Sequence, residues 1–227
     1  MIILTGASGG IGREIATSLC QIDQVLGVYN SSRPEPLENS RLTYEKVDLA
    51  DESAIKKFIE KWTLNLSKIT IIHNASSKVD ALAVHTELSD WDYTMGVNLR
   101  ANFLLTQALL PIMIKDGWGR IVHISSKGGM EGAPGTVAYS ASKTGLIGMS
   151  RVLAKEYARF NITSNILALG AFETGMYLEL SDKIKEDILN RIPSGSPGEV
   201  SNIVNAIHFL IKSEYVNGSV INVDGGA

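Results

Sequence analysis

Cysteine is nearly absent from this chain, since Cys20 is the only one among 227 residues. A single cysteine closes no intrachain disulfide and builds no cysteine-based metal site, so we expect Cys20 to be a small core residue. Histidine is also scarce. His85 and His208 have no partner at metal-ligand spacing, and His73 and His123 lie in or beside apolar segments, where they are predicted to be core or rim residues. No metal site is predicted.

An excess of positive charge is missing as well. The chain has 21 Lys and Arg against 24 Asp and Glu, which argues against a nucleic-acid partner or an anionic membrane surface. The apolar stretch Leu104–Ile114 contains Thr106 and Pro111 and falls short of the roughly 18 residues of a membrane span. The apolar N-terminus meets Thr5 and Gly6 too early for a signal peptide. We therefore expect a cytoplasmic protein without membrane partners.

What the chain does have is an alternation of short apolar runs with longer segments of helical period. Strands are expected at 2–4, 25–29, 42–47, 69–72, 120–124, 162–169 and 220–223, and helices at 11–22, 55–62, 91–114 and 137–160. Strands separated by helices form a parallel sheet with helices on both faces. The prediction is an α/β fold, a three-layer doubly wound sheet in a single domain over 1–227. The connection 30–41 lacks helical period, so a helix there is expected to be short or missing.

A glycine-rich loop, Thr5-Gly6-Ala7-Ser8-Gly9-Gly10-Ile11-Gly12, leaves the first strand and opens the first helix. Glycines allow a tight turn and a close approach to a pyrophosphate, whose charge is met by the helix N-terminus. The spacing is neither G-x-G-x-x-G nor that of a P-loop. The alternative is an ordinary strand-to-helix turn.

The end of the second strand usually distinguishes the nucleotide cofactors. Here it reads Asn30-Ser31-Ser32-Arg33, with no carboxylate and one guanidinium. A carboxylate would repel a 2′-phosphate, so this segment favours NADP, with Ser31, Ser32 and Arg33 as phosphate contacts. The alternative is a solvated loop before Pro34.

Asp48 follows the third expected strand. Its carboxylate can accept a hydrogen bond from an adenine amino group. Alternatively, it only helps to start the next helix, for which Asp51 and Ser53 are competing caps.

Tyr139 and Lys143 lie four residues apart in a helical segment and so share one face. A phenol with a pKa near 10 is a poor acid–base group, and a nearby ammonium is expected to lower that pKa. Ser126 ends the fifth strand at the rim of the sheet, where its hydroxyl can bind a substrate carbonyl. Asn98 lies in a long helix, where it holds a water or bends the helix, or simply faces solvent.

Several motifs occur together and in order: the glycine-rich loop, Asp48, Asn74-Ala75, Val97-Asn98-Leu99, Ile124-Ser125-Ser126, Tyr139-Ser140-Ala141-Ser142-Lys143, Gly170 and Thr174. In this combination the chain resembles the short-chain dehydrogenase/reductase family over essentially its whole length. The resemblance implies a Rossmann fold, a nicotinamide cofactor and dimers or tetramers formed through the long helices. Leu104–Ile114 and Gly145–Phe160 are the candidate interface segments.

The resemblance also implies roles for individual residues. In that reading Tyr139 exchanges the proton, Ser126 orients the carbonyl, Lys143 lowers the tyrosine pKa and holds the nicotinamide ribose, and Asn98 anchors a relay water. Thr174 is expected to hold the carboxamide. The expected cofactor contacts are Gly6, Ser8, Gly10, Ile11, Gly12, Asn30, Ser31, Ser32, Arg33, Asp48, Leu49, Asn74, Ala75, Tyr139, Lys143, Gly170 and Thr174.

Within the family, the chain looks most like 3-oxoacyl-(acyl-carrier-protein) reductases, with several departures. Ser76 replaces a usual glycine, which is expected to reduce backbone freedom beside the cofactor. Gly9 replaces a basic residue of many NADP-dependent members and weakens the case for NADP, leaving NAD possible. Gly117 and Phe160 replace basic residues that recognise the carrier. Acyl carrier protein is therefore a doubtful partner, although Lys115 lies close by.

Residues 171–198 are predicted to form a flap over the substrate. A charged helix expected at 179–190 has Leu178, Ile184, Ile188 and Ile192 on one side, and closure of such a segment excludes water from hydride transfer. The alternative is an ordinary amphipathic surface helix.

Together these features predict hydride transfer between NADP(H) and a small carbonyl or alcohol, most simply reduction of a 3-oxoacyl thioester or a related ketone. One alternative is an NAD-dependent alcohol or sugar dehydrogenase on the same fold. Another is a non-catalytic nucleotide-sensing protein.

Overall fold

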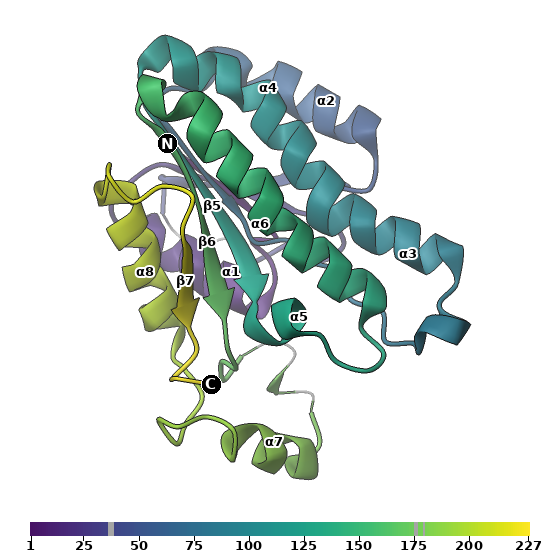
Figure 1. The fold of residues 1–227 in the computed structure, drawn as a ribbon. Coiled ribbons are helices and arrows are strands. Elements are labelled where there is room, and N and C mark those ends of the chain that lie inside the picture. The colour runs from purple at the N-terminus through teal and green to yellow at the C-terminus, as the bar shows by residue number, and fades with distance from the viewer. Residues whose placement is uncertain (36–38, 175–176, 179) are drawn as a thin grey trace.

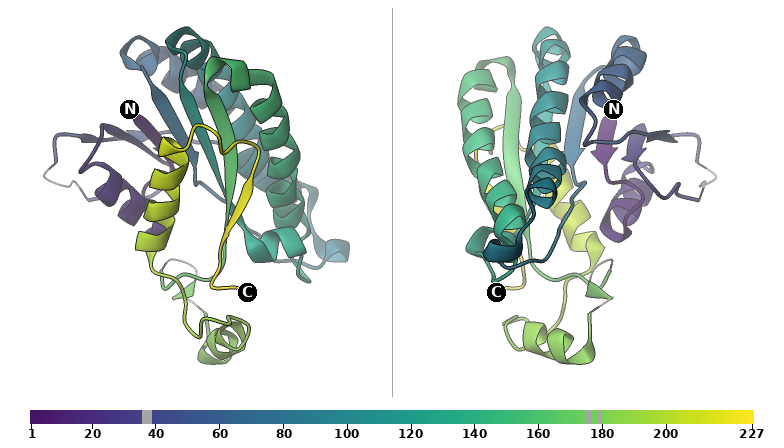
Figure 2. Two further views of the ribbon diagram at one scale, coloured as in Figure 1. Left: turned by 60° about the vertical axis from the view of Figure 1, so that its left-hand side comes forward. Right: turned by 90° about the vertical axis from the view of Figure 1, so that its right-hand side faces the viewer.

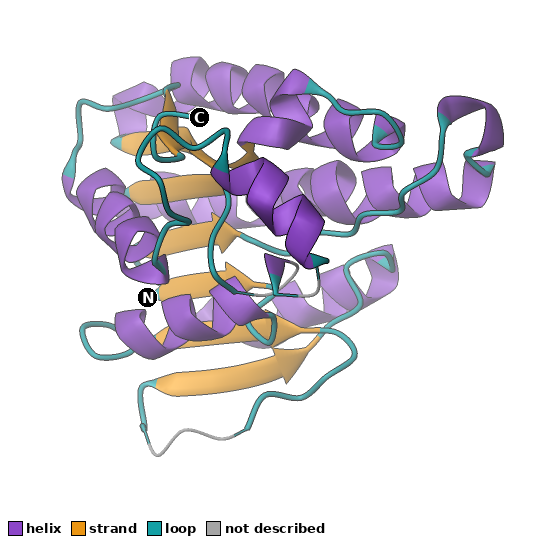
Figure 3. Ribbon diagram, turned by 90° about the horizontal axis from the view of Figure 1, so that it is seen from below, coloured by secondary structure: helices purple, strands orange, loops and turns teal. Residues whose placement is uncertain are grey.

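Seven parallel strands form one sheet in the order β3-β2-β1-β4-β5-β6-β7. The computed structural model describes residues 1–35, 39–174, 177–178 and 180–227. The strands are β1 (Ile2–Thr5), β2 (Val25–Tyr29), β3 (Leu42–Lys46), β4 (Ile69–His73), β5 (Gly119–Ser126), β6 (Ile162–Leu169) and β7 (Val220–Val223). Figure 3 shows them as one continuous row. The order reverses between β1 and β4, so the loops that leave these two strands flank the crevice where such sheets bind ligands.

Helices cover both faces of the sheet (Figures 1 and 2). One face carries α1 (Gly10–Leu19) and α8 (Val200–Lys212), and the other carries α2 (Glu52–Trp62), α4 (Ala101–Asp116) and α6 (Val137–Tyr157). The shorter helices are α3 (Leu88–Met95), α5 (Lys127–Glu131) and α7 (Asp182–Leu189). The three-layer doubly wound fold is confirmed, and the described parts form a single domain around this sheet.

The core explains why these segments fold as they do. Every residue of β4 is buried, as expected for a central parallel strand with helices on both faces. Helix α8 was not predicted, although Val200, Ile203, Ile207 and Leu210 recur at helical spacing and are buried against the sheet. The short helix α5 was not predicted either.

The helix expected over 91–114 is interrupted. A π-helical turn, Gly96–Arg100, joins α3 to α4 and contains Asn98, and π turns of this kind frequently lie at functional sites. The combined helix Leu88–Asp116 is the one helix, among the residues described, that is long and apolar enough to cross a membrane, and half of its apolar window is buried in the protein.

The long connection after β2 contains no helix at 30–35 or 39–41, which confirms the prediction for these residues. Gly117 ends α4 with a left-handed backbone (φ 59°), and its N–H bonds to the carbonyl of Ile114. Because glycine adopts this conformation without strain, Gly117 terminates and caps α4.

Candidate active site

The glycine-rich loop turns tightly between β1 and α1. Gly6 has a φ of 67°, and a Cβ on it would lie 2.8 Å from the Cα of Ala75, while a Cβ on Gly12 would collide with the carbonyl oxygen of Gly6. The amide of Asn74 donates to the carbonyls of Thr5 and Gly6 at 3.2 and 3.1 Å. The predicted cofactor residues Gly6, Gly12, Asn74 and Ala75 therefore form one packed unit across the switch point.

This unit has the properties that a pyrophosphate requires. Gly9 is the N-cap of α1 and makes no side-chain cap bond, so the first-turn N–H groups of the helix are available to an anion. Ser8 and Ile11 are half-buried beside it, and Gly10 is exposed. The residues present fit a bound dinucleotide at this loop.

The end of the crevice beside the loop after β2, where the adenosine is expected, is open. The loop after β2 is exposed at Asn30, Ser31, Ser32 and Arg33. This exposure fits both predicted alternatives, a phosphate-binding segment and a solvated loop. Arg13, which was not predicted as a site residue, pairs with Glu35 at 3.2 Å and brings a second guanidinium to this loop.

The helix-start alternative for Asp48 is resolved. Asp51 is the N-cap of α2 and accepts from the Ser53 N–H at 2.8 Å. Asp48 is exposed and accepts only a local bond from the Ala50 N–H at 2.9 Å, which leaves acceptor capacity for a ligand. Leu49 is buried.

Ser126, Tyr139 and Lys143 converge at the carboxyl end of β5. Gly129, in α5, reveals how closely they pack, because a Cβ on it would lie 2.7 Å from the Tyr139 ring and 3.3 Å from both the Lys143 stem and Ser126. Ser126 is the N-cap of α5, and its Oγ accepts from the Gly129 N–H at 3.1 Å. The O–H of Ser126 is thereby left to donate elsewhere. Gly129 was not singled out from the sequence.

The predicted effect of Lys143 on Tyr139 is wrong for this structure. Burial raises the pKa of Tyr139, and the neighbouring Ser126 hydroxyl, the charge of Lys78 and the Ser76 hydroxyl oppose that rise. The ammonium of Lys143 instead donates to the carbonyl of Ile124 at 2.9 Å, and burial lowers its own pKa to about 8. Tyr139 is therefore a neutral phenol at pH 7, able to donate a proton.

Asn98 does not face solvent. Its side chain is 0% exposed and clamps the main chain of Ser77, accepting from the N–H at 2.7 Å and donating to the carbonyl at 2.8 Å. It also donates to the Ser142 hydroxyl at 3.0 Å, and Ser142 donates to the carbonyl of Tyr139 at 2.7 Å. Asn98 thus ties the loop after β4 to the helical turn that carries Tyr139 and Lys143.

The loop after β4 also contains Ser76 and Lys78, which were not predicted as site residues. Ser76 and Lys78 both influence Tyr139, and Lys78 pairs with Asp80 at 2.8 Å. Positive φ values at non-glycine residues occur, in the ranges described, only at Lys68 and Asn161. Ser76 therefore occupies the usual glycine position without left-handed strain.

His73 and His123 are core residues, as predicted. Both are fully buried and stack with ring centroids 4.9 Å apart. Their Nε2 atoms bond to the hydroxyls of Thr106 (2.9 Å) and Ser164 (3.4 Å). Burial lowers both pKa values, that of His123 to about 3. Cys20 is also buried, and the described residues contain no cluster suited to a metal ion.

The predicted flap lies beyond the carboxyl ends of the strands. Figure 1 shows α7 apart from the sheet at that end, and none of its residues is fully buried. Gly170 donates to the carbonyl of Val223 at 3.0 Å, and Thr174 to that of Phe172 at 2.7 Å. The start of the expected helix, Glu179, lies outside the described residues, as do 175 and 176.

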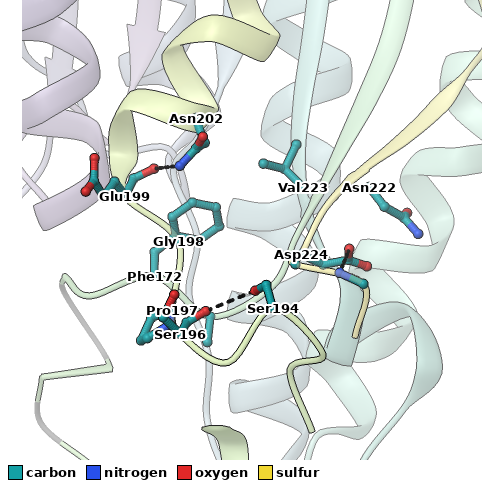
Figure 4. A pocket seen from close by; sticks show the side chains of 13 residues that line it. Phe172, Ser194, Ser196, Pro197, Gly198, Glu199, Asn202, Asn222, Val223 and Asp224 are labelled. Carbon is teal, nitrogen blue, oxygen red and sulfur yellow. Dashed lines mark hydrogen bonds between the residues drawn. The ribbon is translucent and has the colours of Figure 1, made fainter.

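A cavity of about 590 Å³ is lined by residues from both ends of this segment, from the start of α8 and from the end of β7 (Figure 4). Phe172, Glu199, Asn202, Val223 and Asp224 are among its lining residues, and none of the four predicted catalytic residues lines it. The cavity therefore does not mark the chemical centre.

The doubly wound sheet, the glycine-rich turn at its switch point and the group formed by half-buried Ser126 with buried Tyr139, Lys143 and Asn98 define a dinucleotide-dependent oxidoreductase. The family model described as short chain dehydrogenase matches residues 1–185. The chain belongs to the short-chain dehydrogenase/reductase family, and is accordingly an NAD(P)-dependent oxidoreductase.

Individual relatives agree with this assignment. The chain is 38% identical to the 3-oxoacyl-[acyl-carrier-protein] reductase of Thermotoga maritima, covering 99% of this chain and 96% of the relative. It is 36% identical to the Rickettsia conorii reductase of the same name, covering 99% and 95%. Among solved structures, a putative NAD(P)-dependent gluconate 5-dehydrogenase from Beutenbergia cavernae, with NADP bound at low occupancy, matches with a TM-score of 0.89 at 29% identity, over 99% of this chain and 95% of that one.

Proposed function

We propose that this protein transfers a hydride between NADP(H) and a small carbonyl or alcohol, and that it reduces a 3-oxoacyl thioester or a related ketone. The observation that carries the proposal is the convergence of Ser126, Tyr139 and Lys143 at the carboxyl end of β5, the same edge of the parallel sheet from which the glycine-rich loop leaves β1. Relatives named 3-oxoacyl-[acyl-carrier-protein] reductase support the thioester, and the NADP in the similar solved structure supports the cofactor.

In this mechanism the bound nicotinamide supplies the hydride. Ser126 donates its O–H to the substrate carbonyl, since its oxygen already accepts from Gly129. Tyr139 then gives its proton to the developing alkoxide, which suits a phenol that burial keeps neutral. Lys143 is proposed to hold the nicotinamide ribose, from a position fixed by its hydrogen bond to the carbonyl of Ile124. Asn98 keeps the loop after β4 against this turn of α6.

The remaining proposed cofactor contacts follow the crevice from the glycine-rich loop to the open adenosine end. Arg33 and Ser32 are proposed to hold the 2′-phosphate, and Asp48 the adenine. Gly170 and Thr174 are proposed to lie at the carboxamide, and residues 171–198 to close over the substrate. We also propose that the protein is cytoplasmic. It is further proposed to form a homodimer or homotetramer, and the exposed apolar side chains of Phe103 in α4 and Val152 in α6 support this association.

A panel of carbonyl substrates with NADPH and NADH tests the proposal. Free 3-oxoacyl thioesters are expected to be reduced with NADPH, and carrier-bound thioesters no better, because Gly117 and Phe160 offer no cation. Turnover with NADH alone would favour the NAD-dependent alcohol or sugar dehydrogenase. Cofactor binding without turnover on any substrate would favour the non-catalytic sensor and overturn the proposal.

A further inference from the structure

The segment between Ser77 and Ala81 is held at one end by the π-helical turn Gly96–Arg100 and at the other end by the residues that immediately precede α6. At one end Asn98 holds both main-chain groups of Ser77. At the other end Ala81 pairs with Thr136, and its N–H donates to the carbonyl of Gly135 at 3.0 Å. Thr136 immediately precedes α6, three residues before Tyr139. Both anchors therefore hold the loop that carries Lys78 beside the helical turn that carries Tyr139.

Lys78 differs from the other lysines of this region in its ion pairs and hydrogen bonds. Lys143 is fully buried and donates to Ile124. Lys127 pairs with Glu131 at 3.3 Å and with Asp224 at 3.5 Å, of which Asp224 is largely buried. Lys78 pairs only with Asp80, whose side chain is 64% exposed. An exposed ion pair of this kind is weak and readily exchanged for another anion.

We propose that Lys78 is a substrate-binding residue that selects carbonyl compounds carrying a carboxylate within one or two carbons of the reacting carbonyl. The inference rests on the proposed reductase function. It specifies which of the proposed ketone substrates the protein prefers, namely oxo acids. In the complex the substrate carboxylate takes the place of Asp80 as the partner of Lys78, while the carbonyl faces Ser126 and Tyr139. The charge of Lys78 opposes the rise in the pKa of Tyr139, which agrees with the placement of the loop by its two anchors.

Acetoacetate and methyl acetoacetate provide the test, because they share a carbon skeleton and differ in charge. We expect Lys78→Met to lower kcat/KM for acetoacetate about 10- to 100-fold, mainly through KM, as for loss of a hydrogen bond to a charged group. Methyl acetoacetate, which is neutral like a thioester, should be affected less than threefold, roughly the scale of an ordinary surface change. Lys78→Arg should retain most of the activity on the acid, and Lys56→Met, a change at an exposed lysine of α2, should leave both substrates unaffected.

The outcomes separate this inference from the function on which it rests. If Lys78→Met lowers turnover of the acid and the ester alike, or of neither, the inference is overturned while the reductase function stands. The inference is also overturned if the kcat/KM of the wild type for methyl acetoacetate equals its kcat/KM for acetoacetate. NADPH binding, followed by fluorescence, should be equal in wild type and variant, and a loss of binding would assign Lys78 a structural role instead. Failure of the wild type on both substrates and on thioesters would overturn the reductase function, and the inference with it.

Discussion

The chemical end and the adenosine end of the crevice are built differently. Around Tyr139, the side chains of Asn98 and Lys143 are buried, and each is held by hydrogen bonds to residues distant in the sequence. Around Arg33, the residues from Asn30 to Glu35 are exposed apart from Pro34, and the described side-chain contact of that stretch is the Arg13–Glu35 pair. The chemical end is preorganised by packing, whereas the end beside Arg33 offers a ligand mainly exposed polar and charged side chains.

The largest effect is expected from removing the proton donor of the chemical end. Tyr139→Phe should lower kcat about 10²–10⁴-fold, the usual contribution of a positioned acid–base group, because the phenol oxygen is lost while the ring still packs. NADPH binding by fluorescence should be nearly unchanged. Tyr157→Phe, the same change near the far end of α6, is the control. Near-normal turnover of Tyr139→Phe would show that the buried group is not the catalytic one.

Lowering the pH should reduce the stability of the folded protein, because the stacked histidines His73 and His123 are buried. The folded pKa of His123, about 3, lies below the unfolded value of about 6.5. The unfolded chain therefore binds the proton first, so stability is lost as the pH falls below about 6.5 toward 3. The expected loss is about 3 kcal/mol between pH 6.5 and 4 for this one group, at roughly 1.4 kcal/mol per pH unit.

Urea denaturation at pH 7 and pH 4 measures this loss. His123→Asn should lose less stability between the two pH values than the wild type, and His85→Asn, at an exposed position, should behave like the wild type. A pH dependence of stability that is identical in all three proteins would contradict the assignment.

Substitution of Asn98 tests whether its hydrogen bonds to the main chain of Ser77, the clamp, affect turnover or only stability. Asn98→Ala leaves the main-chain groups of Ser77 without partners and should cost about 2 kcal/mol of unfolding free energy, together with a fall in kcat of at least about tenfold. Asn102→Ala, one turn further along, removes a buried amide that bonds only to the carbonyl of Asn98. It should destabilise the protein with a smaller loss of kcat. Equal kcat in the two variants would make the clamp purely structural.

The same contrast explains what could be predicted from the sequence. The sheet and the glycine-rich turn depend on local patterns, namely apolar runs and glycine spacing, so they were predicted nearly residue by residue. The burial of Asn98 was not, because it depends on Ser77 and Ser142, which lie 21 and 44 residues away. The shift of the Tyr139 pKa was predicted in the wrong direction because spacing places Lys143 on the same helix face but gives no information on burial or on the Ile124 carbonyl. Lys78 is brought to the site only by the two anchors of its loop.

The smallest effect is expected at the open end. Arg33→Ala should weaken NADPH binding about tenfold, the loss of one exposed charge-assisted contact, and leave NADH binding and the urea midpoint unchanged, because Arg33 is exposed. The effect should shrink at high salt, since an exposed charge is screened within about 10 Å at 0.1 M. Arg13→Ala is the informative companion, because it releases Glu35 near the same loop. An uncompensated carboxylate there should disfavour NADPH further, and an unchanged preference in both variants would show that neither guanidinium determines which cofactor the open end accepts.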